Sequence, residues 1–220
     1  SADLFVVAST LHGSLSLRRA ITDPSRDASA KETLVKDLFK SLSAPAIDLT
    51  AKVSSLRWSN SGDLVNVLEQ LAIEAQASAA NIDGVLDRVE DELFAAEQAV
   101  SGSPELRKAL ITVGADSAKV GIVKDLFAKN GSPYTVALLG ELVTTLRGRS
   151  IEVAFHDYKY ALAARRNRVI ALVRVAVALT DAQRDRLATA LTAQVGQPVR
   201  INIEVDPNVL GGVAIKFADE

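Results

Sequence analysis

The sequence has 220 residues, of which 24% are charged, and its formal net charge of −2 at pH 7 argues against a nucleic-acid or anionic-membrane surface. Because it contains no Cys, disulfides and thiolate metal sites are excluded. Its most apolar run, Val169 to Leu179, is too short to span a bilayer and carries Arg174 at its centre, so we expect no membrane span in this stretch.

The first part of the sequence predicts a series of short helices. Apolar side chains at helical spacing place them over 4–13, 15–21, 29–42 and 45–57. Gly13 is a plausible end for the first helix, and Ser29 with Glu32 three residues later predicts a capping box at the start of the third. Pro45 suits the first turn of the fourth helix, where its missing N–H has no helical partner to lose.

A longer helical stretch follows. Between Asp63 and Gly102 the strongest breaker is Gly84, which weakens a helix by about 1 kcal/mol relative to Ala. We therefore expect one helix to run nearly into the next, with a bend at Gly84. Further helices are predicted after Ser103, Ser117, Ser132 and Ser150, the last one ending near 168.

One segment occurs twice. Ser29 to Phe39 (SAKETLVKDLF) and Ser117 to Phe127 (SAKVGIVKDLF) are identical at eight of eleven positions, and weaker matches extend the similarity at an offset of 88 to 90 residues. Such internal self-similarity indicates a repeated structural unit. We expect equivalent helices whose last residues, Val35, Leu38 and Phe39 in the first and their counterparts in the second, face a core.

The pattern changes after residue 168. Val169 to Leu179 is rich in β-branched residues, Thr180 with Gln183 predicts a capping box, and strict alternation predicts strands over 199–205 and 213–217. The sequence thus predicts a mainly α protein: two tandem homologous helical bundles, 1–81 and 82–168, and a small C-terminal α/β (β-α-β-β) domain, 169–220.

The C-terminal part resembles the delta subunit of F-type ATP synthases, the bacterial counterpart of OSCP. The resemblance rests on a strand ending in Leu-Thr, an amphipathic helix and the turn Val-Asp-Pro-Asn-Val-Leu-Gly-Gly, which contains Asp206, Pro207, Gly211 and Gly212. The helical part resembles the family's N-terminal bundle, including Arg147 after its fourth helix. A second bundle is similar to actinobacterial subunits in which a b subunit is fused ahead of delta.

The resemblance implies further expectations about the extent of the chain. The chain contains no Met and begins with Ser1, from which we expect a processed chain or part of a longer one. The first helix of the first bundle (1–81, copy one) is shorter than its counterpart in the second bundle (82–168, copy two), so its missing turns are expected upstream. The C-terminal domain is expected to be incomplete, because the family usually continues with another strand and a helix.

The resemblance also implies a function and partners. We expect a non-catalytic stator component that links the catalytic head to the b-type stalk helices and resists rotor torque, at the cytoplasmic face of the plasma membrane in a membrane-anchored complex. The N-terminal helices of the alpha subunits are expected in a groove of copy two, between its first and fifth helices. The groove residues are Val85, Val89, Leu93, Val153, Asp157 and Tyr160. The alternative is that the apolar residues among them, Leu93 in particular, close the core of the bundle.

No catalytic constellation, cofactor site or metal site is expected, because no phosphate loop, G-x-S-x-G or H-E-x-x-H motif is present. Arg165, Arg166 and Arg168 fall at a helix C-terminus, where cations oppose the helix dipole, and a stalk contact is the functional alternative. Gly211 and Gly212 are interpreted as a turn between strands. The alternative function is a tandem helical-bundle adaptor protein unrelated to ATP synthase.

Overall fold

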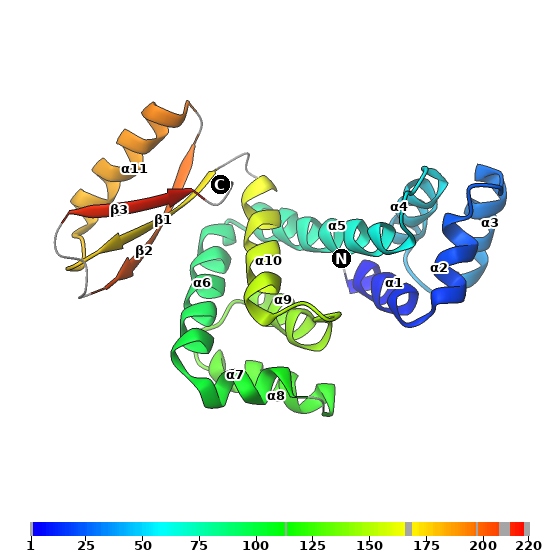
Figure 1. The fold of residues 1–220 in the computed structure, drawn as a ribbon, viewed down its shortest axis with the longest axis horizontal. Coiled ribbons are helices and arrows are strands. Elements are labelled where there is room, and N and C mark those ends of the chain that lie inside the picture. The colour runs from blue at the N-terminus through cyan, green and yellow to red at the C-terminus, as the bar shows by residue number, and fades with distance from the viewer. Residues whose placement is uncertain (1, 113, 166–168, 197, 207–211, 218–220) are drawn as a thin grey trace.

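The computed structural model describes residues 2–112, 114–165, 169–196, 198–206 and 212–217. They form an elongated, mainly helical molecule with a small sheet at one end (Figure 1). The helices are α1 (Ala2–Gly13), α2 (Leu15–Thr22), α3 (Ala28–Leu38), α4 (Ala44–Ser55), α5 (Ser61–Ile82), α6 (Leu86–Gly102), α7 (Pro104–Ile111), α8 (Asp116–Leu126), α9 (Pro133–Thr144), α10 (Ile151–Arg165) and α11 (Asp181–Val195). The strands are β1 (Val169–Val175), β2 (Val199–Val205) and β3 (Val213–Phe217).

Short polar side chains begin many of these helices. The hydroxyl of Ser14 accepts a hydrogen bond from Leu17 N–H in the first turn of α2, and Ser103 caps α7 in the same way. At α11 the predicted capping box is confirmed, with Thr180 and Gln183 satisfying each other's backbone N–H groups. Each cap occupies a backbone donor that has no partner inside the helix.

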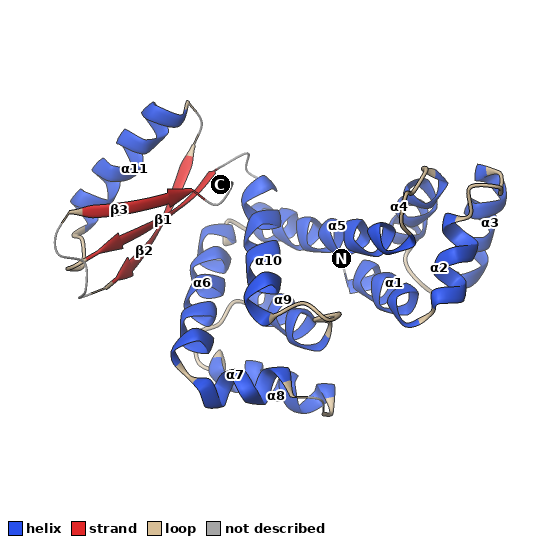
Figure 2. Cartoon of the chain, in the orientation of Figure 1, coloured by secondary structure: helices blue, strands red, loops and turns tan. Residues whose placement is uncertain are grey.

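Helices α1–α5, here the first helical group, surround one hydrophobic core. Its fully or nearly fully buried members come from α1 to α5 and include Val7, Leu11, Ile21, Val35 and Leu64. Helix α1 packs along α5, and α3 packs against α4 (Figures 1 and 2). The apolar positions predicted from helical periodicity are thus the ones that form this core.

Helix α5 belongs to two cores. Leu64 and Leu68 in its first half lie in the core of the first helical group, whereas Ala77 and Ala80 near its end lie in a second core, with side chains from α6–α10. The helix ends at Ile82, and Gly84 adopts a φ of +70°, which a residue with a Cβ rarely adopts. The two helices follow one another nearly without interruption, as predicted, but the chain breaks between Ile82 and Leu86 instead of bending within a helix.

Helices α6–α10, here the second helical group, build most of that second core, to which Leu4, Phe5 and Ala46 of the first helical group also belong. It is filled by large side chains with almost no exposed surface, namely Leu86, Leu93, Leu138, Leu142, Phe155, Tyr158 and Leu162. Helix α10 packs between α5 and α6, and α8 packs against α9. One long helix therefore connects the two groups without a flexible linker between their cores.

The C-terminal domain, here β1–β3 with α11, is a three-stranded sheet in the order β2-β1-β3. Strand β1 is parallel to β2 and antiparallel to β3, and α11 covers one face through Leu191 against Ala171, Val173 and Ile201. The predicted β-α-β-β order is confirmed. Strand β1 stops at Val175 rather than at Leu179, because its pairing with β2 and β3 ends there.

The repeated segment differs from prediction in two respects. Helices α3 and α8 begin at Ala28 and Asp116, without side-chain caps, so Ser29 opens no capping box. Val35, Phe39 and Val123 are buried as expected, but Leu38 and Leu126 are 40% and 51% exposed. Each helix ends at this Leu, and the following Phe is the C-cap residue and packs inward.

Candidate partner-binding surface

The six residues predicted to line a groove fall into two sets. Val153 and Tyr160 lie on the outer face of α10, each 47% exposed, and Asp157 lies between them on the same face. Val89 and Leu93 have no exposed surface and lie in the second core, against which Val85 packs. The structure therefore brings the first three together on the surface and places the other three inside or at the edge of the core.

The burial of Val89 and Leu93 corrects the expectation that they face a partner helix. They continue a stripe with Leu86, Ala96 and Val100, at the spacing by which a helix turns one face towards a core. Helix α10 packs directly on this stripe. The accessible surface is therefore the outer face of α10, not a space between α6 and α10.

Two depressions flank this outer face. A cleft of about 510 Å³ lies on one side and includes Phe94, His156 and Tyr160 together with side chains of the sheet. A groove of about 300 Å³ lies on the other side, between α5 and α10, and includes Gln70, Asp157 and Tyr160. Tyr160 contributes to both, which makes its half-exposed ring the central apolar contact available on this surface.

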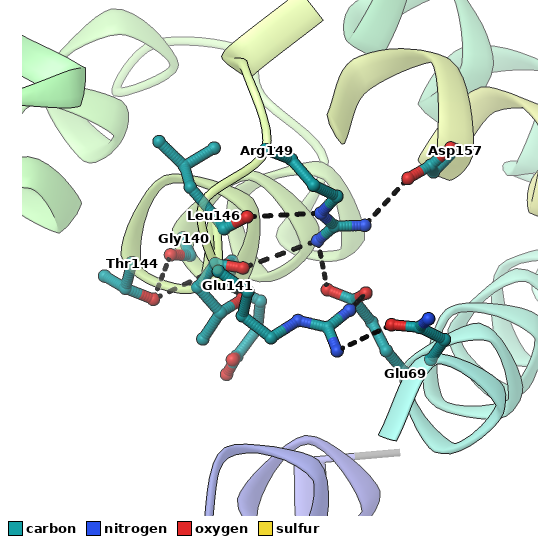
Figure 3. Close-up of polar contacts among 10 residues, drawn as sticks. Glu69, Gly140, Glu141, Thr144, Leu146, Arg149 and Asp157 are labelled. Carbon is teal, nitrogen blue, oxygen red and sulfur yellow. Dashed lines mark hydrogen bonds and ion pairs between the residues drawn. The ribbon is translucent and has the colours of Figure 1, made fainter. Parts of the chain in front are cut away.

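An ionic cluster, drawn in Figure 3, contributes Glu69, Arg149 and Asp157 to the groove between α5 and α10. Arg149 donates from Nη1 to Asp157 Oδ2 at 2.7 Å and from Nη2 to Glu69 Oε1 at 2.9 Å. Arg147 pairs with the other oxygen of Glu69 and donates to Asn66 Oδ1 at 3.0 Å. The loop after α9 is thus joined to α5 and to α10 by two guanidinium groups.

Most of this cluster is buried. The side chains of Glu69 and Arg147 are 6% and 9% exposed, and that of Arg149 is 21% exposed. Burial, assisted by the neighbouring charge of Arg149, lowers the pKa of Arg147 to about 10. Arg147 remains protonated at neutral pH, so the cluster holds two cations between the carboxylates of Glu69 and Asp157.

The remaining predicted positions lie at the C-terminal domain. Asp206 N–H donates to Val175 O at 2.9 Å, which extends the β1–β2 pairing by one residue, and Gly212 has a φ of +83° just before β3. Asp206 and Gly212 therefore flank the turn expected here, while Pro207 and Gly211 lie outside the described residues. Of the three arginines predicted at a helix C-terminus, Arg165 is the last residue of α10 and its side chain is not described, while Arg166 and Arg168 lie outside the described residues.

Comparison with known proteins shows the family to which this chain belongs. The family model described as "ATP synthase delta (OSCP) subunit" matches residues 73–220. The chain belongs to this family. It is 43% identical over 220 residues to the ATP synthase subunit delta of Streptomyces avermitilis, covering 99% of this chain and 81% of that protein. The corresponding subunits of Kineococcus radiotolerans and Thermobifida fusca are 38% and 39% identical, with 80% and 82% of their lengths covered.

The delta (OSCP) match begins at Ile73, within α5, and thus includes the second helical group and the C-terminal domain. The relatives nevertheless align with nearly all of the chain, so the first helical group is common to them. Family membership makes the chain a non-catalytic subunit of an ATP synthase.

In the described ranges, no three His, Asp or Glu side chains come close enough to hold a metal ion. No helix of this described part is both long and apolar enough to cross a membrane.

Proposed function

We propose that the chain is a stator component of the peripheral stalk of an F-type proton-translocating ATP synthase, which links the catalytic head to the stalk. The observation that supports this function most directly is the delta (OSCP) family match over 73–220. The same match leaves little support for an unrelated tandem adaptor. A stator must transmit torque without bending, and helix α5, which is shared between two cores, suits that demand.

The N-terminal helix of an alpha subunit is proposed to bind the outer face of α10. An amphipathic helix could place apolar side chains on Val153 and Tyr160 and a basic or amide side chain on Asp157. The groove on one side and the cleft on the other provide depressions for its flanking residues. This surface replaces the one that included Val89 and Leu93.

The b-type stalk helices are proposed to bind the C-terminal domain and the segment that contains Arg165, Arg166 and Arg168. Localisation follows from these partners, at the cytoplasmic face of the plasma membrane in a membrane-anchored complex. A b-delta fusion in the parent polypeptide remains part of the proposal.

The two helical groups are proposed to be homologous bundles, with domains at 1–81, 82–168 and 169–220. Paired contacts support this proposal. Asp3 Oδ2 accepts a hydrogen bond from Ser43 N–H at 3.0 Å before α4, and 89 residues later Glu92 Oε2 accepts one from Ser132 N–H at 2.9 Å before α9. The Ser14 and Ser103 caps are also 89 residues apart. Equivalent side chains thus make equivalent contacts.

Reconstitution tests the proposed function. Inverted membrane vesicles are depleted of this subunit, and ATP-driven proton pumping is followed by quenching of a pH-sensitive dye. Adding the full chain should restore rebinding of the catalytic head and proton pumping, whereas Tyr160→Glu should restore them less well. Full coupling in depleted vesicles without the chain would contradict the stator function.

A further inference from the structure

Among the described residues, Arg200 of the C-terminal domain enters an acidic cluster on the helical part. Arg200, on β2, donates from Nη1 to Asp87 Oδ1 at 3.2 Å and forms an ion pair with Glu90 Oε2 at 2.9 Å. Its Nη2 donates to Asp91 Oδ1 at 2.5 Å and to the backbone oxygen of Asp87 at 3.1 Å. These partners lie more than 100 residues away in the sequence, so the contact is purely tertiary.

The geometry of both elements favours this contact. Asp87, Glu90 and Asp91 are spaced i, i+3 and i+4, which places them on one face of α6 near its N-terminus. On β2, Val199 and Ile201 face the core under α11, so Arg200 between them points to the opposite side of the sheet, towards the helices. The Arg200 side chain is only 12% exposed, and charge-assisted hydrogen bonds of this kind are stronger than neutral ones.

Elsewhere in the described part of this boundary, α10 contacts β1 beside a cleft. The core of the C-terminal domain is separate from the core of the second helical group. Between them lies the cleft of about 510 Å³, with Leu172, Asn202 and Lys216 of the sheet on one wall and Phe94 and Tyr160 on the other. Among the described residues, the two parts therefore share no hydrophobic core across this boundary.

We infer that Arg200 and the three carboxylates of α6 form an electrostatic latch, which holds the C-terminal domain against the helices and can be opened without unfolding either part. The closed latch keeps the sheet opposite Tyr160, and the open latch exposes the cleft side of α10. A contact held by charge weakens as salt screens it, whereas an apolar interface does not.

Distance measurement between paired spin labels tests the latch. The chain contains no Cys, so Ala99→Cys on α6 and Gln194→Cys on α11, both at exposed positions, give two specific labelling sites in the full chain. At low salt one narrow distance distribution is expected. It should broaden and lengthen in 1 M NaCl, where the screening length is about 3 Å, and should do so even at low salt in Arg200→Glu.

Charge reversal provides the decisive comparison. Combining Arg200→Glu with Asp87→Arg and Asp91→Arg should restore the narrow distribution. The matched control is Arg174→Gln, because Arg174 pairs at 2.8 Å with Glu204 within the same sheet and should leave the distribution unchanged. Far-UV circular dichroism checks that each variant is folded. A broad distribution in the unsubstituted chain, no change in folded Arg200→Glu, or no recovery in the folded reversed-charge variant would each overturn the latch.

Discussion

Replacing Glu69 by Gln is expected to destabilise the helical part strongly. The substitution preserves shape but removes the carboxylate that both Arg147 and Arg149 contact. Arg149 keeps its pair with Asp157 and its bond to Leu146 O, whereas Arg147 keeps only Asn66 among its polar contacts described above. Removing one partner of a buried ion pair costs about 3–5 kcal/mol.

The lower end of that range applies here, because Arg149 is partly exposed and retains a carboxylate. A loss of about 3 kcal/mol corresponds to a fall in Tm of roughly 6–12 °C for a chain of this size. Calorimetry and urea unfolding followed by helical circular dichroism measure the change. The matched control is Glu152→Gln, whose pair with Arg107 is about half exposed on both sides and should contribute about 1 kcal/mol or less.

A double substitution separates the ion pair from the side chain itself. Glu69→Gln with Arg147→Gln should cost less than the sum of the two single changes. In each single variant one charge of the Glu69–Arg147 pair loses its partner, whereas the double variant removes both charges. If Glu69→Gln costs no more than Glu152→Gln, or if the single changes simply add, the buried cluster is not what joins the loop to α5.

The purified chain should hydrolyse no ATP in a phosphate-release assay, and robust hydrolysis that responds to mutation would refute the stator function. Tyr160→Glu should weaken titrated binding of an alpha-subunit N-terminal peptide without loss of helicity, whereas Val6→Glu, at a 50% exposed position in α1, should not. Phe39→Ala should cost about 3–5 kcal/mol in urea unfolding, whereas Leu38→Ala at its exposed neighbour should cost about 0.5 kcal/mol or less. Burial raises the pKa of Glu141 above its ordinary 4.5, so this carboxyl group holds its proton more tightly in the folded chain than in the unfolded chain. Its ionisation therefore lowers the free energy of unfolding as the pH rises above 4.5. Glu141→Gln should therefore stabilise the chain at pH 7, and the difference should vanish below about pH 4; a constant difference across this range would exclude the titration.

Periodicity predicted most of the fold because the signals were local. The stripes that bury Val35 and Phe39 repeat with the helical period, and the alternation in β2 places Val199 and Ile201 on one face. The prediction for Leu38 was wrong because the buried stripe runs through Lys31, Val35 and Phe39, which leaves Leu38 at its edge. The repeat itself could be found only by comparing the sequence with itself.

The candidate surface was harder to predict. Val89 and Val153 are both apolar residues in amphipathic helices, and only packing decides that the first is in a core and the second is on the surface. Glu69 and Arg200 were missed because their partners lie about 80 and 110 residues away. For Glu69 one signal was present, namely a carboxylate beside Leu68 in an otherwise apolar stripe.

The sharing of α5 between two cores has a consequence for how the chain unfolds. Melting Ser61–Ile82 removes Leu68 from one core and Ala77 from the other, so neither helical group keeps its packing when this helix is lost. Amide hydrogens in the middle of α5 should then exchange only through opening of the whole helical part, and those of α11 through a separate, smaller opening. A peripheral stalk under load would accordingly lose both helical groups together or neither.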